Sequence, residues 1–430
     1  MAFETFSQIM SLRQEIVVTG VGVVSPIGIG KVPFWTSLVE GRSGIRRLDL
    51  HHDPTLSPPI GGAVADFDPK QYVRPRKSLK VMSRDIQLAF AAADLACVDA
   101  DLREKPVAPE RLGVVFGAGI IPCELDELMG AYCDCIVGGK FDYSRWGQAA
   151  MAELFPLWIL KYLPNMPACH IGIGQDARGP NNSITLGDVS SLSALAEAAR
   201  VLERGQADAV IAGGVGAKLH PAAWMRGLNG ELSRRGDEPG AASRPFDAAR
   251  DGLVNGEGSG ALVLETRAHA QSRGEPPLAR VLGHAVVFEP PGGKAAVGES
   301  IRRAILTALR DAEITPGEVG FVAAHGLSTV DDDRIEAQAI RSALGDVPVT
   351  APKSYFGHLG PAAGALEAAM SVLALHAGLI PPTLNYERPD PQCPVNVVHG
   401  RPAPLERPTA MVLAHSHHGQ AVAVVLGGAD

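Results

Sequence analysis

The sequence predicts an α/β fold made of two similar halves. Short apolar runs alternate with amphipathic stretches along the 430 residues, which is typical of strands and helices packed in layers. Glycine and proline are plentiful, at 48 and 33 residues, so many tight connections between strands and helices are expected. The alternation starts again after residue 266. A chain of this length can bury a large core, and we expect the two halves to share it.

The expected strands are apolar on both sides. A strand of this kind needs a covering layer on each face, so neither half is expected to fold without the other. We expect one sheet in each half. The strands are predicted at residues 15–24, 112–117, 183–186, 209–213 and 260–265 in the first half, and at 279–288, 320–324, 348–350, 410–414 and 421–426 in the second.

The boundary between the halves is predicted in the polar run 267–277, RAHAQSRGEPP, which ends in two prolines. The N-terminal half then covers residues 1–266 and the C-terminal half covers residues 267–430. The principal helices are predicted at 190–204, 299–312, 333–344 and 362–375.

Composition narrows the function classes. The net charge of -8 argues against a nucleic-acid partner, because phosphate contacts need clustered lysine and arginine. No apolar run reaches the ~18 residues of a membrane-spanning helix, so no membrane partner is expected. The first 15 residues lack the basic and apolar regions of a secretory signal. We therefore expect a cytoplasmic protein.

The six cysteines support a reducing compartment and are expected to be buried structural thiols. Cys133 and Cys135 stand too close together for an ordinary zinc knuckle, and no second pair is near them. None of the six has the sequence context of a nucleophile. They are Cys97, Cys123, Cys133, Cys135, Cys169 and Cys393.

Several long motifs resemble the β-ketoacyl synthase family of condensing enzymes, over about residues 15–426. Their number and their order make the resemblance specific. It implies a thiolase-like α/β fold in which two similar halves form an αβαβα layered sandwich. The motifs are the opening IVVTGVGVVSPIG, FDAARDGLVNGEGSGALVLE (246–265), AAHGLSTVDDD (323–333), APKSYFGHLGPAAGALEA (351–368) and PPTLNYERPDP (381–391).

The resemblance also implies the catalytic positions, and one of them has changed. The family places a nucleophilic cysteine eight residues after a Gly-Pro, at a helix start that lowers the thiol pKa. Here Pro180 is followed eight residues later by Asp188, in GPNNSITLGDVSSLSALAEAA. The family's two histidines, which assist decarboxylation of malonyl thioester and stabilise the enolate, fall on His325 and His358. Its lysine falls on Lys353.

A second departure lies in the glycine-rich loop near the carboxyl end. In the family this loop reads roughly NSFGFGGTNA and supplies an oxyanion N–H and an aromatic gate, whereas this chain reads LAHSHHGQA at 413–421. A side chain in place of a required glycine implies a different loop geometry. On the resemblance, the altered gate and oxyanion loop consists of His415, Ser416, His417 at the gate, His418 in place of a glycine, and the retained Gly419.

Asp188 has several possible roles. As an acyl acceptor it is poor, because a carboxylate would form a mixed anhydride that hydrolyses readily. As a structural residue it would cap the following helix through the N–H of Ser190 or Ser191, or pair with a protonated His325 or His358. Some relatives carry glutamine here and decarboxylate malonyl-carrier protein. An ionised aspartate would repel the malonyl carboxylate and the enolate, so this role requires a protonated Asp188.

A metal site is a further alternative, since carboxylate and imidazole together suit zinc or iron. The favoured interpretation is structural: the extra histidines fill the loop and bind no metal. We therefore expect no cofactor. The candidate ligands are Asp188, His325 and His358 with one of His415, His417 and His418, of which His417 is preferred.

The segment 117–128, GAGIIPCELDEL, resembles the family loop that lines the acyl tunnel at the dimer interface. Ile120 and Ile121 are therefore the candidate acyl-pocket residues, although adjacent isoleucines are ordinarily core. Basic residues are candidates for docking an acidic acyl carrier protein, against the ordinary role of solvated surface. They are Arg74, Arg76, Lys77, Lys80, Arg234 and Arg235.

These residues favour a non-condensing, ketosynthase-like subunit of a type II fatty-acid or polyketide synthase system. It resembles the chain-length-factor subunits, which lack the cysteine and form heterodimers with an active, cysteine-bearing ketosynthase; a homodimer is the alternative. Because His325 and His358 are retained, a second hypothesis stays open. It is malonyl-carrier-protein decarboxylation, or another acyltransferase-family reaction that uses these histidines and Lys353.

Overall fold

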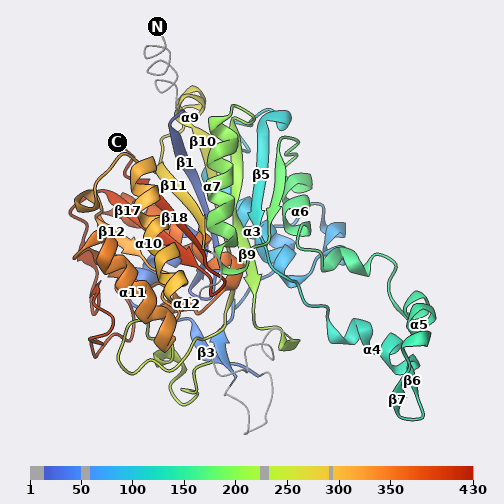
Figure 1. The fold of residues 1–430 in the computed structure, drawn as a ribbon. Helices are drawn as coiled ribbons and strands as arrows, with labels where there is room; N and C mark the ends of the chain where they lie inside the picture. The colour runs from blue at the N-terminus through green and yellow to red at the C-terminus, as the bar shows by residue number, and fades with distance from the viewer. Residues whose placement is uncertain (1–13, 50–58, 223–231, 290–293, 430) are drawn as a thin grey trace.

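The computed structural model describes residues 14–49, 59–222, 232–289 and 294–429. A mixed sheet of 12 strands runs through the described chain, and helices pack on it (Figure 1). The strands lie in the order β15-β13-β12-β17-β18-β11-β1-β10-β9-β5-β8, and β2 pairs with β1. All ten predicted strands are confirmed; the one predicted at 183–186 begins and ends two residues earlier.

The strand bounds follow the apolar runs. In the first half they are β1 (Ile16–Ser25), β2 (Gly28–Ile29), β5 (Leu112–Gly117), β8 (Asn181–Ile184), β9 (Ala209–Ala217) and β10 (Glu257–Thr266). In the second half they are β11 (Ala279–Phe288), β12 (Phe321–Ala323), β13 (Pro348–Thr350), β15 (Asn396–Val397), β17 (Thr409–His415) and β18 (Gln420–Gly427). Three small hairpins or ladders stand apart: β3 (Ile45–Arg47) with β4 (Ile60–Gly62), β6 (Ile136–Val137) with β7 (Lys140–Phe141), and β14 (Leu379–Ile380) with β16 (Ala403–Pro404).

The two halves do not have separate sheets. The first residues of β1 pair with β11 on one side while they also pair with β10 on the other, so hydrogen bonds join the halves. This junction covers only three residue pairs, Ile16 with Val281, Val17 with Arg280 and Val18 with Ala279. Beyond it the two parts of the sheet diverge, and this leaves room for helices between them.

The helices form the remaining layers. The helices α7 (Ser190–Glu203) and α13 (Ala363–Ala377) contact strands of both halves and so lie in the middle layer. The helices α3 (Arg84–Asp99) and α6 (Met166–Gly174) cover the first half on its other side, and α10 (Lys294–Asp311) covers the second, with α11 (Val330–Leu344) against it. The predicted αβαβα order is confirmed. The shorter helices are α2 (Lys31–Val39), α4 (Leu125–Asp134), α5 (Trp146–Glu153), α9 (Arg267–Arg273) and α12 (Lys353–Phe356).

The middle layer explains why one helix consists of small residues. α13 has the sequence AGALEAAMSVLALHA and is buried along most of its length. A Cβ at Gly364 would lie 2.5 Å from Cγ of Leu192 in α7, so glycine permits the close approach of the two central helices. The two helices packed against each other place their amino-terminal ends near one another, and the candidate site lies there.

The first seven residues of the predicted boundary run form α9, which is capped by Thr266 and ended by Gly274 in the left-handed conformation. The division of the chain at residue 266 stays a prediction. One expectation needs correction, the burial of all six cysteines. The cysteines are not all buried: Cys97, Cys135 and Cys393 are, while Cys123 and Cys169 are half-buried and Cys133 is exposed. A search of the described helices finds none long and apolar enough to span a bilayer.

A projecting segment, which we call the arm, covers residues 123–165 and stands away from the layered body (Figure 1). It carries α4, the hairpin β6–β7 and α5. Its own hydrophobic cluster is small, with four buried members, so the arm contributes little to the main core. These members are Ala131, Cys135, Ala149 and Leu154.

Candidate functional site

Asp188 lies in a short 3-10 turn, Gly187–Val189, between β8 and α7. The predicted capping role is wrong, because the N-cap position of α7 is Val189 and no side chain bonds there. Ser190 stabilises the turn instead: its Oγ accepts from the N–H of Leu186 and donates to the carbonyl of Gly187. The carboxylate of Asp188 is therefore free to face the second half of the molecule.

Asp188 meets His358 and a lysine that the motifs do not include. Its Oδ1 lies 3.3 Å from Nε2 of His358 and 3.9 Å from Nζ of Lys218, and Lys218 Nζ lies 2.9 Å from the same His358 nitrogen. Asp188 thus lies beside His358, one of the two imidazoles predicted to pair with it in protonated form, and the neighbouring positive charge is that of Lys218. The position of Lys218 directly after β9 could have identified it as a site residue from the sequence. β5, β8 and β9 are parallel, so their carboxyl ends meet at one edge of the sheet.

The surroundings of Asp188 favour its ionised form. Burial raises the pKa of Asp188, but its contacts with His358 and Lys218 outweigh burial and hold this pKa well below its usual range. The protonated Asp188 that the decarboxylase hypothesis required is therefore disfavoured. Asp188 is an ionised carboxylate with Lys218 as its counter-ion.

His325 and Lys353 form a second group at the base of the site. Lys353 Nζ lies 3.0 Å from Nδ1 of His325 and 2.5 Å from Oε1 of Glu367, and it also donates to the His325 carbonyl. All three side chains are buried. Because an ammonium only donates, Nδ1 accepts and the His325 proton is on Nε2, which has no partner in the described part of the chain. Burial and Lys353 hold the His325 pKa well below its usual range, so this imidazole is neutral.

His415 adds a third imidazole that the family motif does not contain. Its ring centroid lies 4.6 Å from that of His325, and its Nε2 lies 3.8 Å from Oε2 of Glu336. Burial lowers the pKa of His415, but the Glu336 carboxylate has the larger effect and raises it above its usual value. Glu336 also accepts from the backbone N–H of His325 and Gly326. The Glu336 carboxylate therefore favours the protonated form of His415, which lies beside the site.

The rest of the altered loop is a tight connection between β17 and β18. Gly419 has φ of +88°, and a Cβ there would lie 2.3 Å from the carbonyl oxygen of Glu289, so glycine is required at this turn. Ser416 Oγ accepts from the N–H of His418. His417 and His418 are exposed, with ring centroids 3.9 Å apart. His418 therefore faces away from the buried histidines.

A cavity of about 640 Å³ connects these groups to the surface. Its lining combines polar, apolar and acidic side chains. The polar group includes Asp188, Lys218, His358, His415, Ser416 and His417; the apolar residues are Leu253, Val297, Leu327, Val330 and Ile335; and the other acidic residues are Asp251, Asp331 and Asp332.

The predicted acyl-pocket and metal residues do not all join this cavity. Ile120 is exposed and Ile121 is buried, and neither lines it. Within the described ranges, no group of three or more His, Cys, Asp or Glu side chains could hold a metal ion. The alternative ligand set of Asp188, His325, His358 and His417 is therefore not assembled in the described chain.

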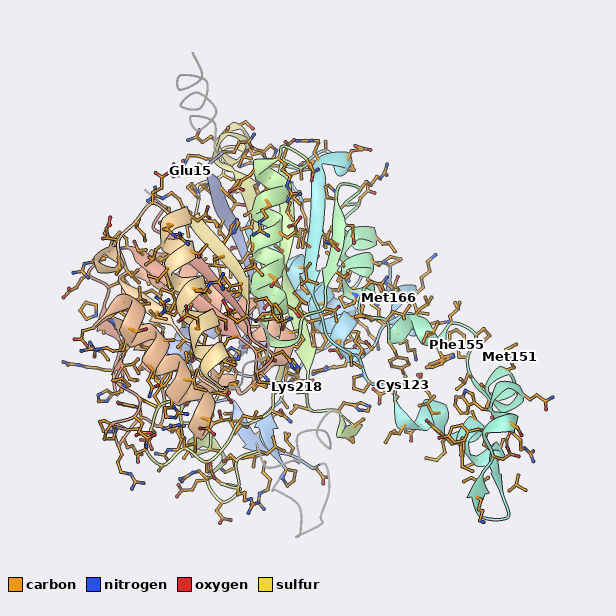
Figure 2. The ribbon with its side chains drawn as sticks, in the orientation of Figure 1. Glu15, Cys123, Met151, Phe155, Met166 and Lys218 are labelled. Atoms are coloured by element: carbon orange, nitrogen blue, oxygen red, sulfur yellow. The ribbon has the colours of Figure 1, made fainter. Side chains whose placement is uncertain are left out.

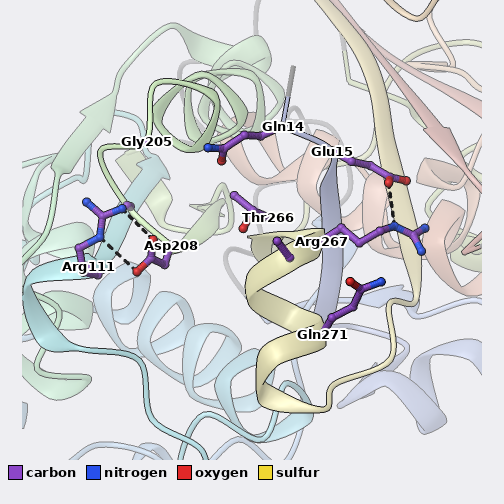
Figure 3. Close-up of a pocket in the computed structure, with 10 residues that line it drawn as sticks. Gln14, Glu15, Arg111, Gly205, Asp208, Thr266, Arg267 and Gln271 are labelled. Atoms are coloured by element: carbon purple, nitrogen blue, oxygen red, sulfur yellow. Dashed lines mark hydrogen bonds and ion pairs between the residues drawn. The ribbon is translucent and has the colours of Figure 1, made fainter. Parts of the chain in front are cut away.

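A second cavity, of about 430 Å³, lies far along the sheet beside the start of β1 and α9 (Figure 3). Its charged side chains pair with one another. Arg111 binds Asp208 through two hydrogen bonds, and Arg267 Nε lies 2.8 Å from Oε2 of Glu15. Because these charged side chains are already paired, this cavity is no rival to the first.

The sequence matches the β-ketoacyl synthase N-terminal domain over residues 13–270 and the β-ketoacyl synthase C-terminal domain over residues 278–387. The chain belongs to the β-ketoacyl synthase family. Its relatives include fatty-acid and polyketide enzymes. A 3-oxoacyl-[acyl-carrier-protein] synthase 2 of Synechocystis is 34% identical over 90% of this chain and 92% of that protein. The tetracenomycin polyketide synthase ketoacyl synthase alpha subunit of Streptomyces glaucescens is 35% identical over 90% of each chain.

Solved ketosynthase structures share the whole fold. The ishigamide ketosynthase/chain length factor superposes with a TM-score of 0.84 at 27% identity, over 97% of this chain and 99% of that one. A type II polyketide synthase acyl-carrier protein in complex with its ketosynthase bound to the hexaketide gives a TM-score of 0.82 at 28% identity, over 97% and 100%. The thiolase-like fold is therefore established, and with it membership in the group of ketosynthases from type II systems.

Proposed function

We propose that this chain is a non-condensing ketosynthase-fold subunit that works beside a cysteine-bearing ketosynthase. The observation that carries the proposal is Asp188, an ionised carboxylate paired with Lys218 at the position where the family motif has its nucleophilic thiol. A carboxylate does not store an acyl group, since the anhydride that it would form hydrolyses. In the described chain no cysteine lines the cavity to replace it.

The comparisons support partners of two kinds. One structural neighbour is a ketosynthase/chain length factor, and the other is a ketosynthase in complex with its acyl-carrier protein. We therefore assign to this chain a heterodimer partner of the same fold and an acyl carrier protein. Three of the six candidate basic residues are exposed together on the 3-10 helix Arg76–Val81 and suit an acidic carrier protein, namely Arg76, Lys77 and Lys80. Arg235 is already bonded to Ala249 and paired with Asp251.

The arm supports a protein partner. Tyr143 is 84% exposed and Met151 is 87% exposed, and Phe155 is also exposed on the same arm (Figure 2). Apolar side chains concentrated on a projecting segment are typical of an interaction surface. The edge strand β8 is the last strand of the described sheet path on the arm's side of the molecule. A partner that covered the arm would bury these side chains.

The arm gives a direct test of association. We expect the double variant Met151→Asp/Phe155→Asp to weaken binding to a cysteine-bearing ketosynthase from the same organism by at least about tenfold, because it places charges in an apolar interface. Analytical ultracentrifugation of the full-length chains measures this. Val32→Asp is the matched control, since Val32 is exposed outside the arm and its change should leave binding unaltered. Unchanged binding in the double variant, or a stable homodimer that excludes the ketosynthase, contradicts the proposal.

Decarboxylation is a second candidate function, and one observation favours it. Lys353 and Glu367 still hold a neutral His325 whose Nε2–H has no partner among the residues that the structure describes, as a donor to an enolate oxygen would require. The ionised Asp188 opposes it, because it repels the malonyl carboxylate.

Release of CO2 from malonyl-carrier protein separates the two functions. We expect near-background release from the wild type and from Asp188→Asn and Asp188→Cys, and any gain to occur with Asp188→Gln. A substantial wild-type rate that Asp188→Asn abolishes would show that Asp188 is catalytic and would remove the proposed function.

A further inference from the structure

Lys218 and His358 are held side by side by one stretch of backbone. The N–H of Lys218 donates to the carbonyl of Gly256, the N–H of Gly256 donates to the carbonyl of His358, and the N–H of His358 donates to the carbonyl of Val254. An isolated bridge between Asn255 and His358 marks the same contact. Main-chain bonds therefore bring the two side chains to the same place independently of their charges.

A glycine leaves room for the lysine. Gly360 has φ of +57°, and a Cβ there would lie 2.5 Å from Cε of Lys218. The aliphatic part of Lys218 passes over Gly360, and its ammonium ends 2.9 Å from His358 Nε2. The side chain is thus directed toward His358 by packing as well as by its anchored backbone.

This contact determines which nitrogen of His358 carries the proton. An ammonium has three donors and no lone pair, so a nitrogen at hydrogen-bond distance from it must accept. A neutral imidazole that accepts through Nε2 has its proton on Nδ1. Burial and Lys218 lower the pKa of His358, against the opposite effect of Asp188, and this favours the neutral ring. Two features oppose this tautomer: Asp188 Oδ1, 3.3 Å from the same Nε2, favours a proton there, and a proton on Nδ1 is buried without a partner among the described residues. The ammonium contact at 2.9 Å is the shorter of the two contacts at Nε2, and an ammonium cannot accept.

We propose that Lys218 is a positioning residue that fixes His358 as the Nδ1–H tautomer and so withdraws its Nε2 as a donor to a ligand oxygen in the cavity. The inference rests on the proposed function and deepens it. Asp188 takes the place of the nucleophile. Decarboxylation moves an electron pair onto the thioester oxygen, and two imidazole N–H groups would stabilise the charge that develops there. Lys218 separately removes one of these two donors. Replacing Asp188 alone then leaves the site impaired.

Histidine NMR tests the tautomer directly. The charged or titratable groups that face His358 are Asp188 beside α7, Lys218 after β9, Lys353 of α12 and His325 after β12. In protein labelled with ¹⁵N-histidine, and assigned by loss of the signal in His358→Gln, we expect an unprotonated Nε2 in the wild type. In Lys218→Met we expect the proton on Nε2, donated to Asp188, and a higher pKa of the ring. Lys140→Met, at an exposed position of the arm, is the matched control and should change neither.

Two NMR results would overturn the inference. One is a protonated Nε2 in the wild type, and the other is an unchanged tautomer in a folded Lys218→Met protein. As a second measurement, we expect Asp188→Gln/Lys218→Met to release CO2 from malonyl-carrier protein at least about tenfold faster than Asp188→Gln, as expected for one restored oxyanion donor. Equal rates would also overturn it. Substantial CO2 release by the wild type would instead contradict the proposed function. The NMR result would still decide the role of Lys218.

Discussion

Lys353→Met is expected to lower the free energy of unfolding by about 3–5 kcal/mol, the range for breaking a buried ion pair from one side. Lys353 and Glu367 are buried, with Nζ 2.5 Å from Oε1. The substitution also removes the donors to Nδ1 and the carbonyl of His325. Burial raises the pKa of Glu367 to about 7 even beside Lys353. Without Lys353, Glu367 takes up a proton and its buried carboxyl group loses the ammonium donor. Urea denaturation at pH 7 measures the loss.

A matched control and a rescue make this prediction specific. Lys105 lies 2.5 Å from Glu275 at the surface, and Lys105→Met should leave the denaturation midpoint unchanged. Lys353→Met/Glu367→Met should recover part of the loss, because apolar side chains can replace a buried ion pair at little cost. A loss under about 1 kcal/mol in Lys353→Met would show that the pair does not stabilise the fold.

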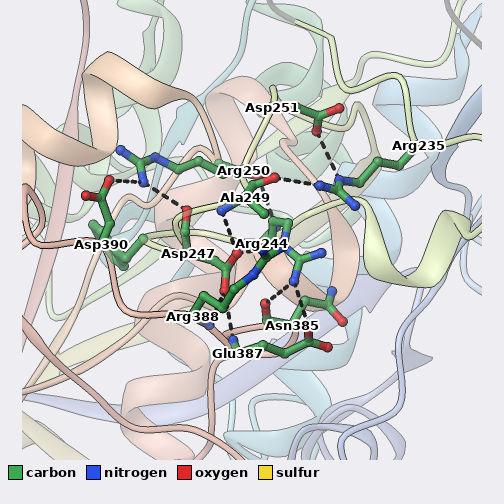
Figure 4. Close-up of polar contacts among 12 residues, drawn as sticks. Arg235, Arg244, Asp247, Ala249, Arg250, Asp251, Asn385, Glu387, Arg388 and Asp390 are labelled. Atoms are coloured by element: carbon green, nitrogen blue, oxygen red, sulfur yellow. Dashed lines mark hydrogen bonds and ion pairs between the residues drawn. The ribbon is translucent and has the colours of Figure 1, made fainter.

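Asp247→Asn is expected to lower the free energy of unfolding by about 3 kcal/mol, because the amide places donors against donors in a buried network. Asp247 is fully buried and joins the 385–390 segment to the body (Figure 4). Its Oδ1 accepts from Ala249 N–H and Arg244 Nε, and its Oδ2 accepts from the N–H groups of Glu387 and Arg388. Urea denaturation of the variant and the wild type measures the difference.

The same variant has a predicted dependence on pH. Burial raises the pKa of Asp247, but the backbone N–H groups and Arg244 outweigh it and hold this pKa below the ordinary 3.8. A carboxyl group with a depressed folded pKa stabilises the protein above its unfolded pKa, and this stabilisation is lost as the pH falls through the folded value. The difference between wild type and Asp247→Asn should therefore be largest from pH 5 to 7 and narrow below about pH 4. Asp346→Asn, at an exposed ion pair with Arg341, is the control and should show no such difference. A gap that is constant with pH would contradict the assignment.

Much of the fold was predicted from local patterns of apolar residues in the sequence. Strand runs such as 112–117 and 279–288 are predicted at their observed bounds, because both are predominantly apolar runs; β5 is buried on both faces and β11 only in part. Helix starts were predicted less accurately. α11 begins at Val330, three residues before the predicted start. Two of the three aspartates in its first turn were assigned to a loop, but negative charge at this position stabilises a helix amino terminus. The arm and its two helices were not predicted, because its apolar residues do not pack on the main core.

The candidate site, like the fold, was predicted only in part from the sequence. The motifs place Asp188, His325, Lys353 and His358, and the structure brings all four to one end of the central helices. The role of Asp188 could not be derived from them. Capping was the expected role from position alone, yet Ser190 forms the local bonds and Asp188 pairs across the halves.

The sequence by itself determined the α/β fold, the family and the position of the changed nucleophile, because these depend on residue patterns that are local or follow in a fixed order. Only the tertiary structure decided the charge of Asp188, the presence of Lys218 and the partner of His415. These depend on distances between side chains that follow β9 and α12 and side chains of η6 (Gly187–Val189), of α11 and of the end of β17, which lie far apart in the chain. Their pKa values and tautomers follow from burial and from neighbouring charge, and a linear sequence specifies neither.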